Sequence, residues 1–161
     1  MQLKVLTVNM HKSVGPWLRR PTLAGLRHAL HASGADLACL QEVRGATAGS
    51  PPQHEAMADG LWPQHAYGRN AAGPTGEHGN AVLSRLPIAA VHNHDVSLPG
   101  AEPRGLLHCR LALPAGRAAP HVVCVILGLR ESPRRHQLAR LAALVDTLPA
   151  DAPLVVAGDF N

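Results

Sequence analysis

The stretch LVVAGDFN, residues Leu154–Asn161, decides how the rest of the chain is interpreted. It opens with a run of apolar residues, which is typical of a strand buried inside a sheet. Asp159 and Asn161 are two positions apart, so on an extended strand their side chains point to the same side. Gly158 has no side chain and lets another backbone or a substrate come close. The sequence therefore predicts a buried strand whose end carries two polar groups.

Other segments share this apolar character and suggest sheets covered by helices. Apolar runs rich in β-branched residues are typical of buried strands, and leucines every three or four positions are typical of helices that pack on a sheet. Strands are expected over residues 3–9, 35–43, 80–84, 88–98, 105–113, 121–129 and 153–161. Helices are expected over residues 21–33 and 133–148, with Ser132 as a cap, and loops over residues 45–53 and 68–79. This order predicts one α/β (α+β) domain over residues 1–161, with helices outside mixed sheets.

The composition indicates a globular domain with a modestly basic surface. The chain has 161 residues, a formal net charge of +4 and a pI of about 9.5, which favours anionic partners. Its three cysteines are far apart in the sequence, which predicts buried free thiols in a reducing compartment. No apolar run reaches the roughly 18 residues of a membrane span, and the N-terminus lacks the apolar core of a signal peptide. We therefore expect a cytoplasmic protein without a transmembrane segment.

Polar side chains stand at the ends of three predicted strands. Asn9 ends the first strand, Glu42 ends the second, and Asp159 and Asn161 end the last. Since ligands of α/β sheets gather where the strands stop, we expect these four side chains to converge. Carboxylate and amide oxygens are the ligands that hard divalent cations prefer, above all Mg²⁺. The pattern therefore predicts a magnesium site at the strand ends.

Four segments, in this order, resemble the endonuclease/exonuclease/phosphatase superfamily: TVNM, LACLQEV, HGNAVLSR and VVAGDFN. This group of metal-dependent phosphoesterases contains DNase I-like nucleases, abasic-site endonucleases and sphingomyelinases. The resemblance runs from Leu3 to Asn161 and implies a DNase I-like, two-layer β-sandwich flanked by helices. It also implies hydrolysis of a phosphodiester or phosphomonoester by in-line attack of water, with Mg²⁺, or alternatively Mn²⁺, stabilising the phosphate oxygens.

The resemblance implies a role for each polar residue. Glu42 matches the magnesium-binding glutamate, and Asn9 matches the asparagine that supports the metal site. Asp159 matches the aspartate that orients or activates the attacking water, and Asn161 matches the asparagine that holds the scissile phosphate. Asn80 matches a position at the rim of the active site. The expected catalytic set is therefore Asp159, Asn161, Glu42 and Asn9. Of these, Glu42 and Asn9 are the expected metal-site residues.

Two further residues complete the expected substrate-binding set with Asn80. Tyr67 resembles a substrate-contacting tyrosine of some relatives, although a packed tyrosine fits the sequence equally well. Arg104, like Arg85, has a guanidinium group suited to bidentate contacts with phosphate, and a surface ion pair is the alternative for both.

Two departures from the family pattern bear on activity. Members of the family continue past the GDFN motif with further strands, an aspartate of the metal site and a closing histidine, so we expect this chain to lack the C-terminal part of the domain. Ile126 stands where many relatives carry a histidine that contacts phosphate, and isoleucine neither transfers a proton nor donates a hydrogen bond. An inactive fragment that at most binds anionic phosphate ligands is therefore the main alternative to an enzyme.

The substrate and the assembly stay open at this point. Nucleic acid, a phospholipid head group and a small phosphoester such as an inositol phosphate all fit the core motifs. A nucleic-acid-binding module is a third interpretation, which the positive charge alone supports. The sequence gives no oligomeric state.

Overall fold

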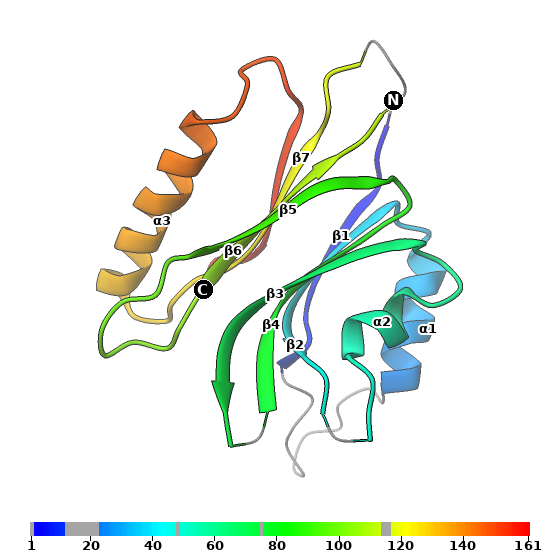
Figure 1. The fold of residues 1–161 in the computed structure, drawn as a ribbon, viewed down its shortest axis with the longest axis horizontal. Helices are drawn as coiled ribbons and strands as arrows, with labels where there is room; N and C mark the ends of the chain where they lie inside the picture. The colour runs from blue at the N-terminus through cyan, green and yellow to red at the C-terminus, as the bar shows by residue number, and fades with distance from the viewer. Residues whose placement is uncertain (1, 12–22, 48, 75, 114–116) are drawn as a thin grey trace.

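Two four-stranded sheets lie face to face in the computed structural model, which describes residues 2–11, 23–47, 49–74, 76–113 and 117–161 (Figure 1). The first sheet has the strand order β1-β2-β4-β3, and the second has the order β5-β6-β7-β8. The strands are β1 (Val5–Asn9), β2 (Leu37–Arg44), β3 (Gln64–Gly73), β4 (Gly76–Ser84), β5 (Ile88–Asp95), β6 (Gly105–Leu111), β7 (His121–Ile126) and β8 (Leu154–Asp159). The helices are α1 (Leu23–Ser33), α2 (Gln53–Ala58) and α3 (Glu131–Asp146).

Buried apolar residues form three layers across the two sheets. Between the sheets, Val82 of the first sheet belongs to the same fully buried cluster as Val122 of the second. On the outer face of the first sheet, α1 and α2 contribute Leu30 and Met57 to a second cluster. On the outer face of the second sheet, α3 contributes Leu141 to a third. The structure is therefore the two-layer β-sandwich flanked by helices that the sequence predicts.

Parallel pairing at two places brings strand ends together. Strands β1 and β2 are parallel and joined through α1, while β7 and β8 are parallel and joined through α3. Every residue of β7 is buried, because the first sheet covers one of its faces and α3 covers the other. Parallel neighbours end at the same edge of a sheet. The carboxyl-terminal ends of β1 and β2 therefore lie side by side, and so do those of β7 and β8.

Residues 68–79, which the sequence predicts to be a loop, form most of a hairpin instead. Strands β3 and β4 pair in antiparallel register from Gln64↔Ser84 to Gly73↔Gly76. The glycines that suggest a loop allow close packing here, since a Cβ on Gly79 would lie 2.0 Å from the carbonyl oxygen of Gly68. The loop prediction was wrong because glycine also marks places where two strands approach closely.

Helix boundaries differ from the predictions as well. The short helix α2 begins at the end of the predicted loop 45–53 and has no counterpart among the predicted helices. Helix α3 begins at Glu131 with Arg130 as its N-cap, so Ser132 lies inside the first turn instead of capping it. Pro133 fits that turn because the first backbone N–H groups of a helix have no intrahelical acceptor. Residues 21 and 22, the predicted start of the first helix, lie outside the described residues.

The predicted free thiols are confirmed. Cys39, Cys109 and Cys124 are all free and buried, and burial raises the pKa of the Cys109 thiol to about 12. Within the described ranges, no helix is both long and apolar enough to cross a membrane.

Candidate active site

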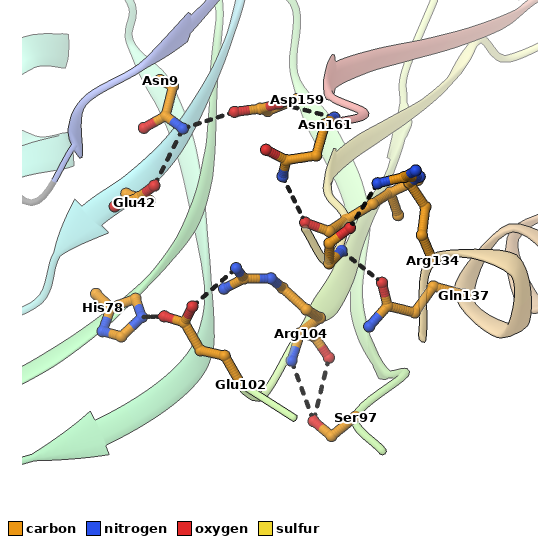
Figure 2. A network of polar contacts seen from close by, with 12 residues as sticks. Asn9, Glu42, His78, Ser97, Glu102, Arg104, Arg134, Gln137, Asp159 and Asn161 are labelled. Carbon is orange, nitrogen blue, oxygen red and sulfur yellow. Dashed lines mark hydrogen bonds and ion pairs between the residues drawn. The ribbon is translucent and has the colours of Figure 1, made fainter. Parts of the chain in front are cut away.

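Three of the predicted site residues meet at one end of the sandwich. The side-chain nitrogen of Asn9, at the end of β1, donates to Glu42 Oε1 at 3.1 Å and to Asp159 Oδ2 at 2.8 Å (Figure 2). Asn9 and Glu42 belong to the first sheet, and Asp159 ends β8 in the second. One amide group therefore holds two carboxylates that come from different sheets.

A bulge in β2 directs Glu42 to this place. The β2–β4 register shifts between Leu40 and Val43, and both of these residues pack in the cluster under α1 and α2. Gln41 points the other way, because its Nε2 donates to Thr7 Oγ1 and to Cys124 Sγ, each at 3.2 Å. Strict alternation would send Glu42 back under the helices, but its φ of 53° turns its carboxylate toward Asn9 instead. A non-glycine residue in this backbone region costs roughly 1–3 kcal/mol, which the surrounding packing must offset.

Asp159 is fixed by its neighbours on β7 and β8. A Cβ on Gly158, whose φ is 153°, would lie 2.0 Å from the carbonyl oxygen of Val125, so only glycine lets β8 approach β7 this closely. The backbone N–H of Asn161 donates to Asp159 Oδ1 at 3.0 Å. With Asn9 on Oδ2, each carboxylate oxygen of Asp159 accepts one hydrogen bond. The carboxylate is therefore held in one orientation at the edge of the site.

Asn161 joins this group through its backbone, while its side chain bonds to the neighbouring segment. Its Nδ2 donates to the carbonyl oxygen of Leu127 at 2.6 Å, and the N–H of Leu127 donates to the carbonyl oxygen of Asp159 at 2.9 Å. Asn161 is exposed. The structure therefore brings together all four predicted catalytic residues.

The donor set fits a magnesium ion that keeps much of its water. Glu42 and Asp159 are only partly buried and offer carboxylate oxygens to solvent. Asn9 directs its nitrogen toward them, and its Oδ1 accepts the N–H of His11 at 2.8 Å, so in this structure Asn9 supports the carboxylates. Among the described residues, no group of three or more His, Cys, Asp or Glu side chains could enclose a metal ion. Mg²⁺ suits such a site, since proteins often hold it by one or two carboxylates together with water and phosphate oxygens.

Two of the predicted substrate-binding residues, Asn80 and Tyr67, form their contacts inside the fold. Asn80 is fully buried between the sheets, where its Nδ2 donates to the carbonyl oxygens of Gly105 at 2.9 Å and Cys124 at 3.3 Å. Asn80 thus ties the two sheets together behind the site. Tyr67 lies on the face under the helices and stacks on His54, with ring centroids 5.0 Å apart and planes 5° apart. Its contacts in the described structure are with that cluster, and burial raises its pKa to about 12.

Arg104 lies near the site and is almost completely buried. Its Nη2 is 2.9 Å from Glu102 Oε2, and Glu102 in turn contacts His78 Nε2 at 3.5 Å (Figure 2). Its backbone is held by Ser97, whose hydroxyl accepts the Arg104 N–H at 3.1 Å. Arg85, by contrast, contacts Asp36 at 3.9 Å.

Ile126 occupies the position next to Asp159 on the neighbouring strand. The two residues are paired in the parallel register of β7 and β8, and Ile126 is only 2% exposed. The wall of the site beside the Asp159 carboxylate is therefore apolar on this strand.

Sequence reasoning missed the residues of α3 that hold the segment after β7. Gln137 is 1% exposed, and its Oε1 accepts the N–H of Gly128 at 2.7 Å. Arg134 Nη1 donates to the carbonyl oxygens of Gly128 at 3.3 Å and Leu129 at 2.9 Å. Gln137 stands four positions before the buried Leu141, so the helical period could have placed this polar side chain on the buried face.

Solved structures of several proteins share this fold. Zebrafish (D. rerio) TDP2 in complex with a single-strand DNA product aligns with a TM-score of 0.74 at 16% identity, over 99% of this chain and 60% of that one. Sphingomyelinase C from Streptomyces griseocarneus aligns with a TM-score of 0.72 at 24% identity, over 99% of this chain and 64% of that one. Identities this low establish the common architecture alone.

Sequence relatives agree with the structural comparison. The uncharacterized protein YbhP of Escherichia coli K12 is 50% identical over 167 residues, covering 98% of this chain and 66% of YbhP. The chain thus spans about two thirds of the length of the curated relatives it matches. The sequence profile described as the Endonuclease/Exonuclease/phosphatase family matches residues 6–161. The chain, with its DNase I-like sandwich and its strand-end cluster of Asn9, Glu42 and Asp159, therefore belongs to the Endonuclease/Exonuclease/phosphatase family.

Proposed function

We propose that this chain carries the site of a magnesium-dependent phosphoesterase that hydrolyses a phosphodiester or phosphomonoester. The observation that carries the proposal is the Asn9 amide bound to both Glu42 and Asp159. Membership of the family supports phosphoester hydrolysis in general, and the partly exposed carboxylates support the metal dependence. Mn²⁺ is the alternative ion, and a cytoplasmic location stays a prediction.

In this proposal each residue of the chain has a separate task. Glu42 holds the cation, which when bound stabilises negative charge on the phosphate oxygens. Asp159, oriented by Asn9 and by the Asn161 backbone, accepts a hydrogen bond from the attacking water and takes up its proton. The side-chain Nδ2 of Asn161 has two N–H groups; one donates to the carbonyl oxygen of Leu127, and the other donates to a phosphate oxygen. Asn9 keeps the two carboxylates at a fixed separation although they belong to different sheets.

A second candidate is a domain that binds phosphate esters without hydrolysing them. Ile126 favours it, because an apolar side chain beside Asp159 supplies no group that could protonate a leaving oxygen. Binding and hydrolysis must therefore be measured separately.

Hydrolysis of bis-p-nitrophenyl phosphate with and without Mg²⁺ or Mn²⁺ tests the first candidate. We expect Asp159→Asn and Glu42→Gln each to lower the metal-dependent rate about 100-fold or more, since they remove the proton acceptor and the cation ligand. The matched controls Asp151→Asn and Glu55→Gln change exposed carboxylates elsewhere and should keep the rate. A folded wild-type protein that binds inorganic phosphate but shows no metal-dependent hydrolysis would favour the second candidate.

A further inference from the structure

We propose that the ester bound at the candidate site carries a second phosphate group, and that a cationic groove beside the site binds it. This inference rests on the proposed function and adds a substrate class, namely esters with two phosphates. The groove lies between residues 99–104 and residues 128–133 and has a volume of about 440 Å³. A volume of this size is within the range of sites for small ligands.

The groove lies next to the segment that Asn161 contacts. Asn161 Nδ2 bonds to the carbonyl oxygen of Leu127, and the next residue, Gly128, lines the groove. Arg104 also lines the groove, and Figure 2 shows its guanidinium directed toward Glu102. The candidate site and the groove are therefore linked through Asn161, Leu127 and Gly128.

Arg104 is the first cation of the groove, and its burial makes it a strong anion-binding group. The residue is 5% exposed, and within the described part of the chain its Nε is buried without a hydrogen-bond partner. Its other side-chain contact is the ion pair with Glu102 at 2.9 Å. A guanidinium held away from water gains most from an acceptor with several oxygens, and phosphate matches its planar donors in two-pronged geometry.

Arg130 and the start of α3 supply further positive charge. Arg130 is exposed, lines the groove and is the N-cap residue of α3, with no capping bond from its side chain. The first N–H groups of this 16-residue helix lack intrahelical acceptors, and Ser132 among them also lines the groove. Among the described residues of the lining, the charged side chains are Arg104, Arg130 and Glu102, so this part of the groove is net cationic. A phosphate, with a charge of about −1.5 to −2 at neutral pH, outweighs the single negative charge of Glu102 as a partner for both arginines.

The chemistry of the lining argues against a quaternary ammonium head group as the occupant. Such groups are bound by aromatic faces, and none of the described residues that line the groove is aromatic. A phosphate can belong to a nucleotide chain or to an inositol phosphate, and both sources share the chemistry proposed here.

Isothermal titration calorimetry with product-like ligands tests the inference without requiring turnover. The ligands are thymidine 3′,5′-bisphosphate, inositol 1,4-bisphosphate, thymidine 5′-monophosphate and phosphocholine, each with Mg²⁺ at low salt. We expect at least one bisphosphate to bind about tenfold more tightly than the monophosphate, and the tighter of the two identifies the source of the second phosphate. Equal affinities for bisphosphates and monophosphate, or tighter binding of phosphocholine, would overturn the proposal.

Substitutions test whether the groove, and not another part of the surface, binds the second phosphate. Arg130→Gln should remove most of the preference for bisphosphates, whereas Arg135→Gln, on the exposed side of the same helix, should keep it. Arg104→Gln should act in the same direction, and Arg130→Gln keeps the test valid if the buried variant does not fold. A preference that survives Arg130→Gln would contradict the groove. Since hydrolysis of bis-p-nitrophenyl phosphate is measured independently, failure of the groove is distinct from failure of the proposed function.

Discussion

The side-chain nitrogen of Asn9 lies 2.8 Å from Asp159 Oδ2, although 150 positions separate the two residues in the sequence. Asn9 ends an edge strand of the first sheet, and Asp159 ends an edge strand of the second. Their hydrogen bond is therefore a direct polar link between the two layers. Because the same nitrogen also reaches Glu42, the separation of the carboxylates depends on how the sheets pack.

Replacing the bridging amide by a carboxylate should expose this dependence. Asn9→Asp removes two donated hydrogen bonds and adds a negative charge beside Glu42 and Asp159. We expect it to lower the free energy of unfolding by about 1–3 kcal/mol at neutral pH, and by more than Asn9→Ala does. Millimolar Mg²⁺ should raise the melting temperature of Asn9→Asp more than that of the wild type, as differential scanning calorimetry can measure. Equal stability of the two variants, with no response to Mg²⁺, would show that the carboxylates do not share one site.

Gly158 should be intolerant of even one added carbon. A Cβ there would lie 2.0 Å from the carbonyl oxygen of Val125, so Gly158→Ala must push β8 away from β7. We expect a loss of unfolding free energy of about 2–4 kcal/mol, together with a loss of hydrolysis because Asp159 moves with its strand. Gly73→Ala is the control, since nothing lies within 4 Å of a Cβ built at Gly73. Similar urea midpoints for both variants would contradict the close approach of the two strands.

Ile126 offers a gain-of-function test of the two candidate functions. Ile126→His places an imidazole beside Asp159 on the neighbouring strand. Where the site hydrolyses phosphate esters, we expect the metal-dependent rate to rise about tenfold to 100-fold, because a proton donor then reaches the leaving oxygen. The double variant with Asp159→Asn should lose this gain. An Ile126→His protein that folds and binds phosphate but, like the wild type, shows no metal-dependent hydrolysis would support binding without turnover.

The second sheet contains a row of histidines that should make stability fall in mild acid. His108 on β6 stacks between His94 and His121, with ring centroids 5.9 Å and 5.0 Å apart, and its Nε2 is 2.8 Å from His121 Nδ1. Burial, with help from His121, His94 and His92, lowers the pKa of His108 from 6.5 to about 4. As the pH falls below about 6.5, His108 takes up a proton in the unfolded chain, but in the folded protein it does so only near pH 4. The free energy of unfolding therefore decreases as the pH falls from about 6.5 to about 4.

His108→Gln should reduce this dependence on pH. We expect the melting temperature to fall by several degrees less between about pH 7 and about pH 5 than it does in the wild type. His136→Gln changes an exposed histidine on α3 and should leave the wild-type slope intact. Parallel slopes for His108→Gln and the wild type would mean that His108 titrates freely.

Much of the fold follows from local pattern, as β7, β8 and α3 show. The apolar run of β7 is continuous because both of its faces are covered, and apolar residues at helical spacing mark α3. The polar ends of β1, β2 and β8 were also predictable, since parallel strands end at a common edge. Asn9, Glu42, Asp159 and Asn161 accordingly meet as the sequence predicts.

Features that depend on distant partners could not be predicted in this way. The bulge at Glu42 exists only because β2 pairs with β4, and no local signal distinguishes it from regular alternation. For Tyr67 the sequence leaves a substrate contact and a packed position equally open, and its strand turns it toward the helices and His54. Asn80 resembled a rim residue and instead holds the two sheets together from a fully buried position. Each of these outcomes is decided by which strand or helix lies opposite.

The buried amide of Asn80 has a consequence for how the domain tolerates change. It spans from β4 to the backbone of β6 and β7, the strand that pairs with β8. A substitution that swells the interior near Asn80 would spread the layers and pull Asp159 away from Glu42, even where the chain still folds. Changes at this part of the interior would then be selected against because they alter the distance between the Glu42 and Asp159 carboxylates, before they lower the melting temperature enough to matter.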